Sequence, residues 1–245
     1  MEPAMNTFYK LISPINGQAN AAARDVPGCH MKSRRPKRRH SKPSLVCGLD
    51  LRGERDHSAL CFLESEYRLN VQTAVREQHF LCRYFRRLRL GLGYPDIADY
   101  VARLNQQLSE RYRREAIYVV DSKSVDSAVL NYFRERIGED QIREVSITVG
   151  SEINDQPETD EFHVPKQQLV AQLQILLETG RLHLPDTIYS RVMKEELLQH
   201  GPKMQGSGTT ALAAKTGQHD ELVTSCSLAV LWLAQQRRLG ALIWF

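Results

Sequence analysis

The sequence lacks the features that define several large protein classes. Its 245 residues include five cysteines, an odd number, and no CxxC pair, which argues against a disulfide framework and against a zinc knuckle. No apolar run approaches the roughly 20 residues of a membrane span, and the N-terminus has no apolar core with a small-residue cleavage site. No G-x-x-x-x-G-K-[ST] sequence is present, so no P-loop ATPase is expected. These absences favour a protein of the reducing cytoplasm with no membrane partner.

Positive charge is concentrated at the N-terminal end. Residues 1–44 hold nine Lys and Arg against two acids, a net charge of +7, whereas the rest of the chain has 24 basic and 27 acidic residues, a net charge of −3. A block of like charge with Pro and Ser repels itself, so we expect residues 1–44 to be a disordered arm and residues 45–245 to be the folded domain. The arm either binds DNA phosphates by counterion release or is a solubilising leader. Its candidate DNA-binding residues are Arg34, Arg35, Lys37, Arg38 and Arg39.

Hydrophobic patterning predicts an α/β domain. The predicted strands are 45–51, 58–63, 68–80, 116–121, 143–150 and 181–184, with a hairpin connection at 64–66. The predicted helices are 94–114, 126–137, 164–179, 185–200 and 219–237, and the predicted loops are 151–163 and 201–217. A strand–helix–strand unit such as 116–150 implies a parallel pair with a right-handed crossover. Residues 83–89 mix Arg with aromatics, which favours a solvated loop with anchoring rings slightly over a nucleic-acid contact.

Acids stand where this arrangement would bring them together. Asp50 and Asp121 each end a predicted buried strand, and Asp220 and Glu221 begin the last helix. Ligands of such sheets bind at the carboxyl ends of the strands, and Mg²⁺ and Mn²⁺ prefer oxygen ligands. Asp50 could bridge two ions about 4 Å apart, with Asp121 on one ion and Asp220 or Glu221 on the other. Helix capping or turn formation explains each acid separately. His219 either assists proton transfer or fixes the start of the helix.

Six short motifs, taken in order, resemble the nuclease domain of phage terminase large subunits. They are Gly48-Leu49-Asp50 with Arg55-Asp56-His57-Ser58-Ala59-Leu60, Tyr118-Val119-Val120-Asp121, Ile147-Thr148-Val149-Gly150, Val164-Pro165-Lys166, Gly180-Arg181-Leu182 and Gly217-Gln218-His219-Asp220-Glu221-Leu222. The resemblance covers about residues 45–236. It implies an RNase H-like mixed sheet, with three antiparallel strands followed by parallel strands and flanking helices.

The resemblance also implies a function. The family cuts concatemeric viral DNA during genome packaging with acidic residues and Mg²⁺ or Mn²⁺, two ions being expected here. By position, Asp50, Asp121 and Asp220 match the catalytic acids, and Glu221 is expected as an additional metal ligand. Lys166 matches a lysine that either faces DNA or begins a helix, and Lys123 adds a positive charge near the site. The expected partners are double-stranded DNA and a separate packaging ATPase, small terminase or portal, in the cytoplasm of a phage-infected or prophage-carrying bacterium.

Three departures from the family pattern keep other functions open. Glu221 stands where the family usually has a second aspartate, the turn after Asp121 has no glycine, and the ATPase motif is missing. We therefore expect a stand-alone nuclease, a split or truncated terminase, or a degenerate relative. The alternatives are a non-catalytic DNA-binding or packaging-accessory module with the same fold, and a structure-specific resolvase.

Overall fold

The structure is a computed structural model that describes residues 45–112, 115–148, 162–199 and 219–242. The chain divides into a unit of residues 1–42 and a unit of residues 43–245, and all the described residues belong to the second unit. The expectations for the arm, for residues 151–161 and for the loop 201–217 therefore concern residues outside the described part.

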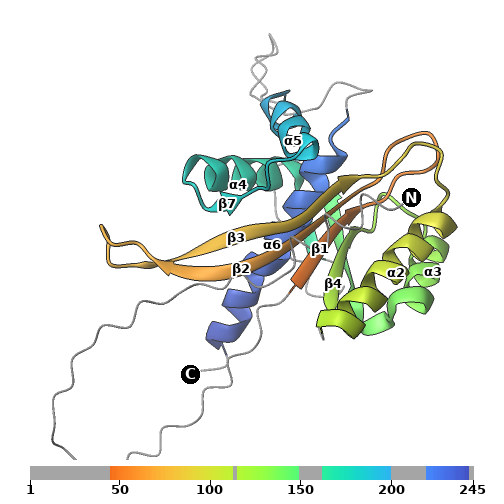
Figure 1. Cartoon of the computed structure of the whole chain (residues 1–245), viewed down its shortest axis with the longest axis horizontal. Coiled ribbons are helices and arrows are strands. Elements are labelled where there is room, and N and C mark those ends of the chain that lie inside the picture. Colours follow the sequence, from red (N-terminus) through yellow and green to blue (C-terminus); the bar gives the residue numbers. More distant parts are fainter. Residues whose placement is uncertain (1–44, 113–114, 149–161, 200–218, 243–245) are drawn as a thin grey trace, which may run out of the picture. The chain divides into compact units, whose positions relative to one another are not determined.

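The described residues form one seven-stranded mixed sheet (Figure 1). Its strands are β1 (Leu45–Asp50), β2 (Ala59–Leu69), β3 (Arg76–Arg87), β4 (Ala116–Asp121), β5 (Ile142–Thr148), β6 (Phe162–Pro165) and β7 (Leu182–His183). Their order is β6-β5-β4-β1-β2-β3-β7. β1, β2 and β3 pair antiparallel, whereas β4, β5 and β6 continue from β1 in parallel. This order and these directions confirm the predicted RNase H-like sheet.

Helices cover both faces of the sheet. They are α2 (Tyr94–Tyr112), α3 (Ser127–Ile137), α4 (Lys166–Glu178), α5 (Ile188–Gln199) and α6 (Glu221–Leu242), with a short 3-10 turn at Glu139–Gln141. Figure 1 shows α2 and α3 side by side, α4 and α5 on the other side of the strands, and α6 crossing behind β1 and β2. No helix of the described residues has the length and apolarity to cross a bilayer.

The side chains of β1 and β4 point alternately to the two faces of the sheet, and both faces are apolar. Val46 and Val119 pack into the core formed with α4, α5 and α6. Tyr118 points to the opposite face, where its hydroxyl donates to Asn105 of α2 at 3.4 Å. Burial on both faces explains why these two strands read as continuous apolar runs.

Gly48 allows α6 to lie directly against β1. A Cβ atom at this position would stand 1.8 Å from the carbonyl oxygen of Ser225 and 2.8 Å from the backbone nitrogen of Ala229. Only a residue without a side chain fits such a backbone approach. Gly48 therefore sets how close α6, at Ser225 and Ala229, comes to β1.

The predicted hairpin connection at 64–66 is wrong. β2 continues to Leu69 and the turn follows it, closed by a hydrogen bond from the Asn70 amide to the Val75 carbonyl at 2.9 Å. The Asn70 side chain also accepts from the Gln72 amide at 3.0 Å, a common turn-forming contact. Residues 64–66 resemble a connection because all three are polar, but Glu64 is buried and its carboxylate is paired with Arg83 of β3.

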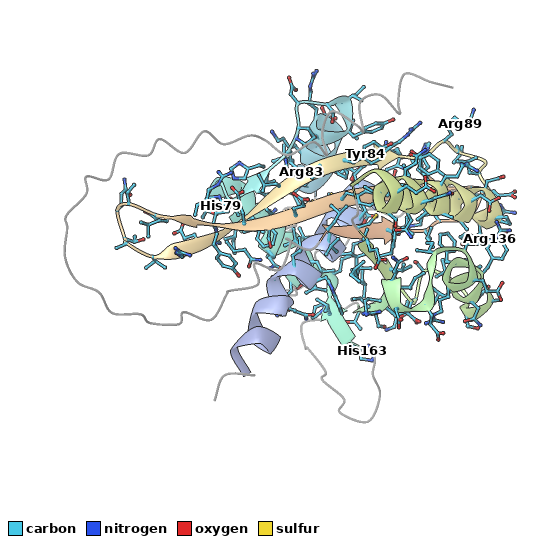
Figure 2. All side chains as sticks on the ribbon, turned by 60° about the horizontal axis from the view of Figure 1, so that its bottom comes forward. His79, Arg83, Tyr84, Arg89, Arg136 and His163 are labelled. Atoms are coloured by element: carbon cyan, nitrogen blue, oxygen red, sulfur yellow. The ribbon has the colours of Figure 1, made fainter. Side chains whose placement is uncertain are left out.

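The predicted loop at 83–89 is also wrong over most of its length. β3 extends to Arg87 and pairs with β2 as far as Ala59. Tyr84 and Phe85 are both buried, and Figure 2 shows Arg83 and Tyr84 on this strand with Arg89 beyond its end. Tyr84 and Phe85 are adjacent in a strand and so point to opposite faces of the sheet. Both are buried because both faces are covered.

Candidate active site

The acids that end β1 and β4 point to the face covered by α6. Asp50 shares its face with Val46 and Gly48, and Asp121 shares its face with Val119, because every second residue of a strand points the same way. Leu49 is paired with Val120 in the parallel register. The next residues, Asp50 and Asp121, therefore lie beside each other on adjacent strands, which are about 4.8 Å apart.

The third acid arrives from the other end of the sequence. Asp220 immediately precedes α6, and its carbonyl accepts the first-turn amide of Thr224 at 2.9 Å. Since α6 lies against β1 at Gly48, its N-terminus reaches the end of that strand. Asp50 and Asp220 are both buried, at 1% and 5% exposure.

Arg52 connects these two buried carboxylates. Its Nε and Nη2 donate to Oδ1 and Oδ2 of Asp50, both at 3.1 Å, and Nη2 also donates to Oδ1 of Asp220 at 3.2 Å. Ser58 fixes the backbone of this turn, because its hydroxyl accepts from the Arg52 amide at 2.9 Å and donates to the Arg52 carbonyl at 3.1 Å. One guanidinium therefore lies between two acids from distant parts of the chain.

Lys166 provides a second cation at the same acid. It is the first residue of α4, and its Nζ forms a salt bridge with Oδ2 of Asp220. Its side chain is 31% exposed, compared with 6% for Asp220. Lys166 thus begins a helix, as one reading of the sequence expects, and also faces the acidic centre.

Asp121 is oriented by the backbone. Its Oδ1 accepts from the amides of Lys123 and Ile147, both at 3.1 Å. Burial raises the pKa of Asp121, and these two amides oppose the rise. The turn without glycine therefore still provides a backbone amide for the carboxylate, while the Lys123 side chain is exposed.

The pKa of Asp50 is affected by its burial and by the other two acids. Burial raises the pKa of Asp50 to about 6. The guanidinium of Arg52 opposes this rise, whereas the negative charges of Asp220 and Asp121 add to it. Crowded carboxylates in a buried site favour a bound cation, because a cation removes the cost of their mutual repulsion.

Glu221 belongs to a different ionic network from its neighbour Asp220. Its Oε1 lies 2.6 Å from Nε of Arg87, and its Oε2 lies 3.8 Å from Nδ1 of His219. The other end of the Arg87 guanidinium binds Glu196 of α5. Burial raises the pKa of Glu196 to about 7, and the charges of Glu221 and Asp220 act in the same direction.

The donor chemistry of the acids fits a hard divalent cation. Among the described residues, no three His, Cys, Asp or Glu side chains are close enough together to hold one metal ion. Asp50 and Asp220 nevertheless share one cationic group already, the guanidinium of Arg52. Mg²⁺ commonly uses only one or two carboxylates, with water and substrate phosphate as its other ligands. These two aspartates are therefore the residues that fit a metal ion, with Asp121 beside them.

The sequence predicts no site role for three residues around these acids. Arg52 lies between the predicted strands 45–51 and 58–63, Arg87 in the predicted loop 83–89, and Glu196 in the predicted helix 185–200. Of the three, only Glu196 has a position in the sequence that indicates burial. It follows the core residue Met193 by three positions and so lies on the buried face of α5. The five candidate basic residues of the arm lie outside the described part of the chain.

The fold and the site together define an RNase H-like domain with acidic side chains at the carboxyl ends of β1 and β4 and at the start of α6. No protein-family model matches the chain, and no curated protein matches it.

Solved structures similar to this chain are terminase nucleases, the kind of protein that the sequence motifs resemble. The large terminase nuclease of thermophilic phage G20c with bound magnesium has a TM-score of 0.48 and 20% identity, over 79% of this chain and 82% of that chain. A second structure of the phage G20c nuclease has a TM-score of 0.43 and 21% identity, over 77% and 82% of the two chains. The manganese-soaked terminase nuclease domain of human cytomegalovirus has a TM-score of 0.42 and 13% identity, over 76% and 81%.

Proposed function

We propose that this chain is a metal-dependent endonuclease that hydrolyses phosphodiester bonds of double-stranded DNA. Asp50, Asp121 and Asp220 are the proposed catalytic acids and would hold Mg²⁺ or Mn²⁺, with two ions as the expected number. Glu221 is the additional acid of the proposal, placed beside Arg87 rather than beside Arg52.

One observation carries the proposal: Asp50 and Asp220 converge on a single cationic group. If a metal ion replaced the Arg52 guanidinium, the two buried carboxylates would form the centre of a metal site. Arg52 is 35% exposed at its side chain, so it can leave toward solvent without unfolding the core. A DNA phosphate is then a suitable new partner for it, because guanidinium groups bind phosphate oxygens well.

The residues of the chain have separate tasks in this mechanism. A bound metal ion would supply Lewis-acid stabilisation of the phosphate charge and lower the pKa of an attacking water. Asp121 keeps its orientation through two backbone amides. Lys166 and the exposed Lys123 are proposed to contact DNA phosphates, together with the N-terminal arm.

The biological setting that we propose is viral genome packaging. The six motifs resemble those of terminase nucleases, and the corresponding reaction is the cutting of concatemeric viral DNA. The proposed partners are double-stranded DNA and a separate packaging ATPase, small terminase or portal. The proposed place of action is the cytoplasm of a bacterial host.

Supercoiled plasmid tests the activity directly. We expect the wild-type chain with Mn²⁺ or Mg²⁺ to nick or linearise the plasmid, and Asp50→Asn to leave it intact. Asp140→Asn is the matched control, because Asp140 is exposed and lies just before β5, away from the acids. Catalysis as proposed is refuted if the wild-type chain leaves the plasmid as intact as Asp50→Asn does.

A non-catalytic DNA-binding module is the second candidate, and the two salt bridges of Asp220 favour it. Arg52 and Lys166 together already balance much of the negative charge of the site without a metal ion. Thermal unfolding separates the two candidates, because a ligand that binds only the folded state raises its stability. The nuclease predicts a higher Tm with Mn²⁺, whereas the binding module predicts stabilisation by DNA alone.

A further inference from the structure

The start of α6 and the acidic centre meet at Asp220, the residue before the helix. Asp220 occupies the N-cap position, where an aspartate side chain usually accepts a hydrogen bond from the amide of the second or third helical residue. In this protein the Asp220 carboxylate binds Arg52 and Lys166 at the acidic centre. The amides of the first turn of α6 also need acceptors, because no preceding turn of the helix supplies them.

Glu196 supplies one such acceptor from a neighbouring helix. Its Oε2 accepts a hydrogen bond from the amide of Val223 at 3.2 Å. Because α6 begins at Glu221, Val223 is its third residue, the position that an N-cap side chain normally serves. Glu196 is 4% exposed, so this contact is a buried one between α5 and α6.

Arg87 ties the same carboxylate to the sheet. Arg87 binds Glu196 of α5 and Glu221 of α6 with one guanidinium. In the sheet, Arg87 is paired with Ala59, and Ala59 is paired with Asp50. Arg87 and Asp50 thus lie on either side of Ala59 across three neighbouring strands. Arg87 binds Glu221, and Asp50 is linked through Arg52 to Asp220, so both contact the start of α6.

From these contacts we propose that Glu196 is a positioning residue of the active site: it accepts from the Val223 amide and binds Arg87, and so fixes the start of α6 and with it the Asp220 carboxylate that binds cations. The inference rests on the proposed function only for the identity of the cation, a divalent metal ion. Glu196 touches neither metal nor DNA in this role. It acts through Val223 and Arg87 on the position of Asp220.

The test compares Glu196→Ala with Glu195→Ala in the full chain. Glu195 is the matched control, since it precedes Glu196 on α5 and is exposed. We expect Glu196→Ala to weaken Mn²⁺ binding in calorimetry by about tenfold or more, as loss of an outer-shell partner commonly does. Glu195→Ala is expected to bind Mn²⁺ as the wild type does.

A second readout needs no metal. In the metal-free protein, we expect the Val223 amide to exchange its hydrogen faster in Glu196→Ala than in Glu195→Ala. Glu196→Gln keeps an oxygen that can accept from Val223, so its Mn²⁺ affinity and Val223 exchange should lie closer to the wild type. If Glu196→Ala does not fold, Glu196→Asp replaces it, because the shorter side chain withdraws the carboxylate from the same amide.

The outcomes separate the two proposals. Unchanged Val223 exchange, or unchanged Mn²⁺ affinity in a variant whose Val223 protection is lost, overturns the positioning role. A wild-type chain that binds no Mn²⁺, although its Val223 protection depends on Glu196, refutes the metal-dependent function and still supports the cap.

Discussion

Arg52 holds Asp50 by two parallel hydrogen bonds of 3.1 Å, from Nε to Oδ1 and from Nη2 to Oδ2. This is the bidentate geometry that makes Arg–carboxylate pairs strong. Asp50 is nearly inaccessible, whereas Arg52 is partly exposed. The pair thus joins a buried acid to a partly exposed cation.

Removal of this cation should make room for a metal ion. We expect Arg52→Gln to lower the Tm of the metal-free protein, because Asp50 and Asp220 then lose their shared partner. The increase in Tm on addition of Mn²⁺ should be larger than in the wild type, since the metal no longer competes with a guanidinium. Arg55→Gln, an exposed change in the same turn, is the control, and a smaller Mn²⁺ effect in Arg52→Gln would contradict the exchange of cations.

Asp220 and Glu221 should differ although they are adjacent. Asp220→Asn removes a carboxylate that contacts Arg52 and Lys166, so we expect loss of Mn²⁺ stabilisation and of plasmid cleavage. Glu221→Gln alters the Arg87 network instead, so a reduced but measurable Mn²⁺ effect is expected. Equal loss in both variants, measured by Mn²⁺-dependent thermal unfolding, would place both acids in one metal-binding set.

Stability should depend on pH through Asp50. Its pKa is raised to about 6 in the folded chain, above the ordinary value of about 3.9. Between these values the folded state binds more protons than the unfolded state, so the free energy of unfolding falls as pH rises, by at most about 1.4 kcal/mol per pH unit for one group. This contribution is present in full below about pH 4 and is lost as pH rises through about 6.

Urea unfolding in metal-free buffer at pH 4.5, 5.5 and 6.5 measures this slope. Asp50→Asn cannot ionise, so we expect a shallower fall in stability over that range than in the wild type or in Asp140→Asn. Identical slopes in all three proteins would exclude Asp50 as the source.

The arm should supply salt-dependent affinity for DNA. Deletion of residues 1–44 removes a net charge of +7, so we expect weaker binding and a smaller slope of log affinity against log salt. Deletion of residues 1–31 is the control, because it keeps Arg34, Arg35 and Lys37–Arg39. Fluorescence anisotropy with a short duplex measures both slopes, and an unchanged slope after the longer deletion would remove the arm from the DNA interface.

The elements that the sequence predicts well are those whose signal is local. β1 and β4 are short apolar runs that end in an acid, and α2 has apolar residues at helical spacing. The three polar residues Glu64–Glu66 interrupt the apolar run of β2 and therefore read as a connection, so the sequence predicts the next strand at 68–80, whereas β3 begins at Arg76. The sequence does not predict β6, because its last two residues, Val164 and Pro165, read as the first turn of the helix that begins at Lys166.

The acids of the site were predictable, but their cations were not. Asp50 and Asp121 end predicted strands, and Asp220 precedes a predicted helix. These positions are enough to expect all three acids at the carboxyl ends of the strands. The contact of Arg52 with Asp220 joins residues 168 positions apart, and that of Arg87 with Glu196 joins residues 109 apart. Such partners depend on how α5 and α6 pack, which no local pattern contains.

The close approach of α6 to Gly48 also has a consequence for the order of folding. β1, β2, β3 and β4 can pair while the chain is still being synthesised, but Asp220 joins Asp50 only after α6 has been made and has docked. Until then Asp50 and Asp121 lack the third acid. On the proposed function, a nascent or truncated chain without α6 cannot cut DNA, so the nuclease becomes active only when its last helix is in place.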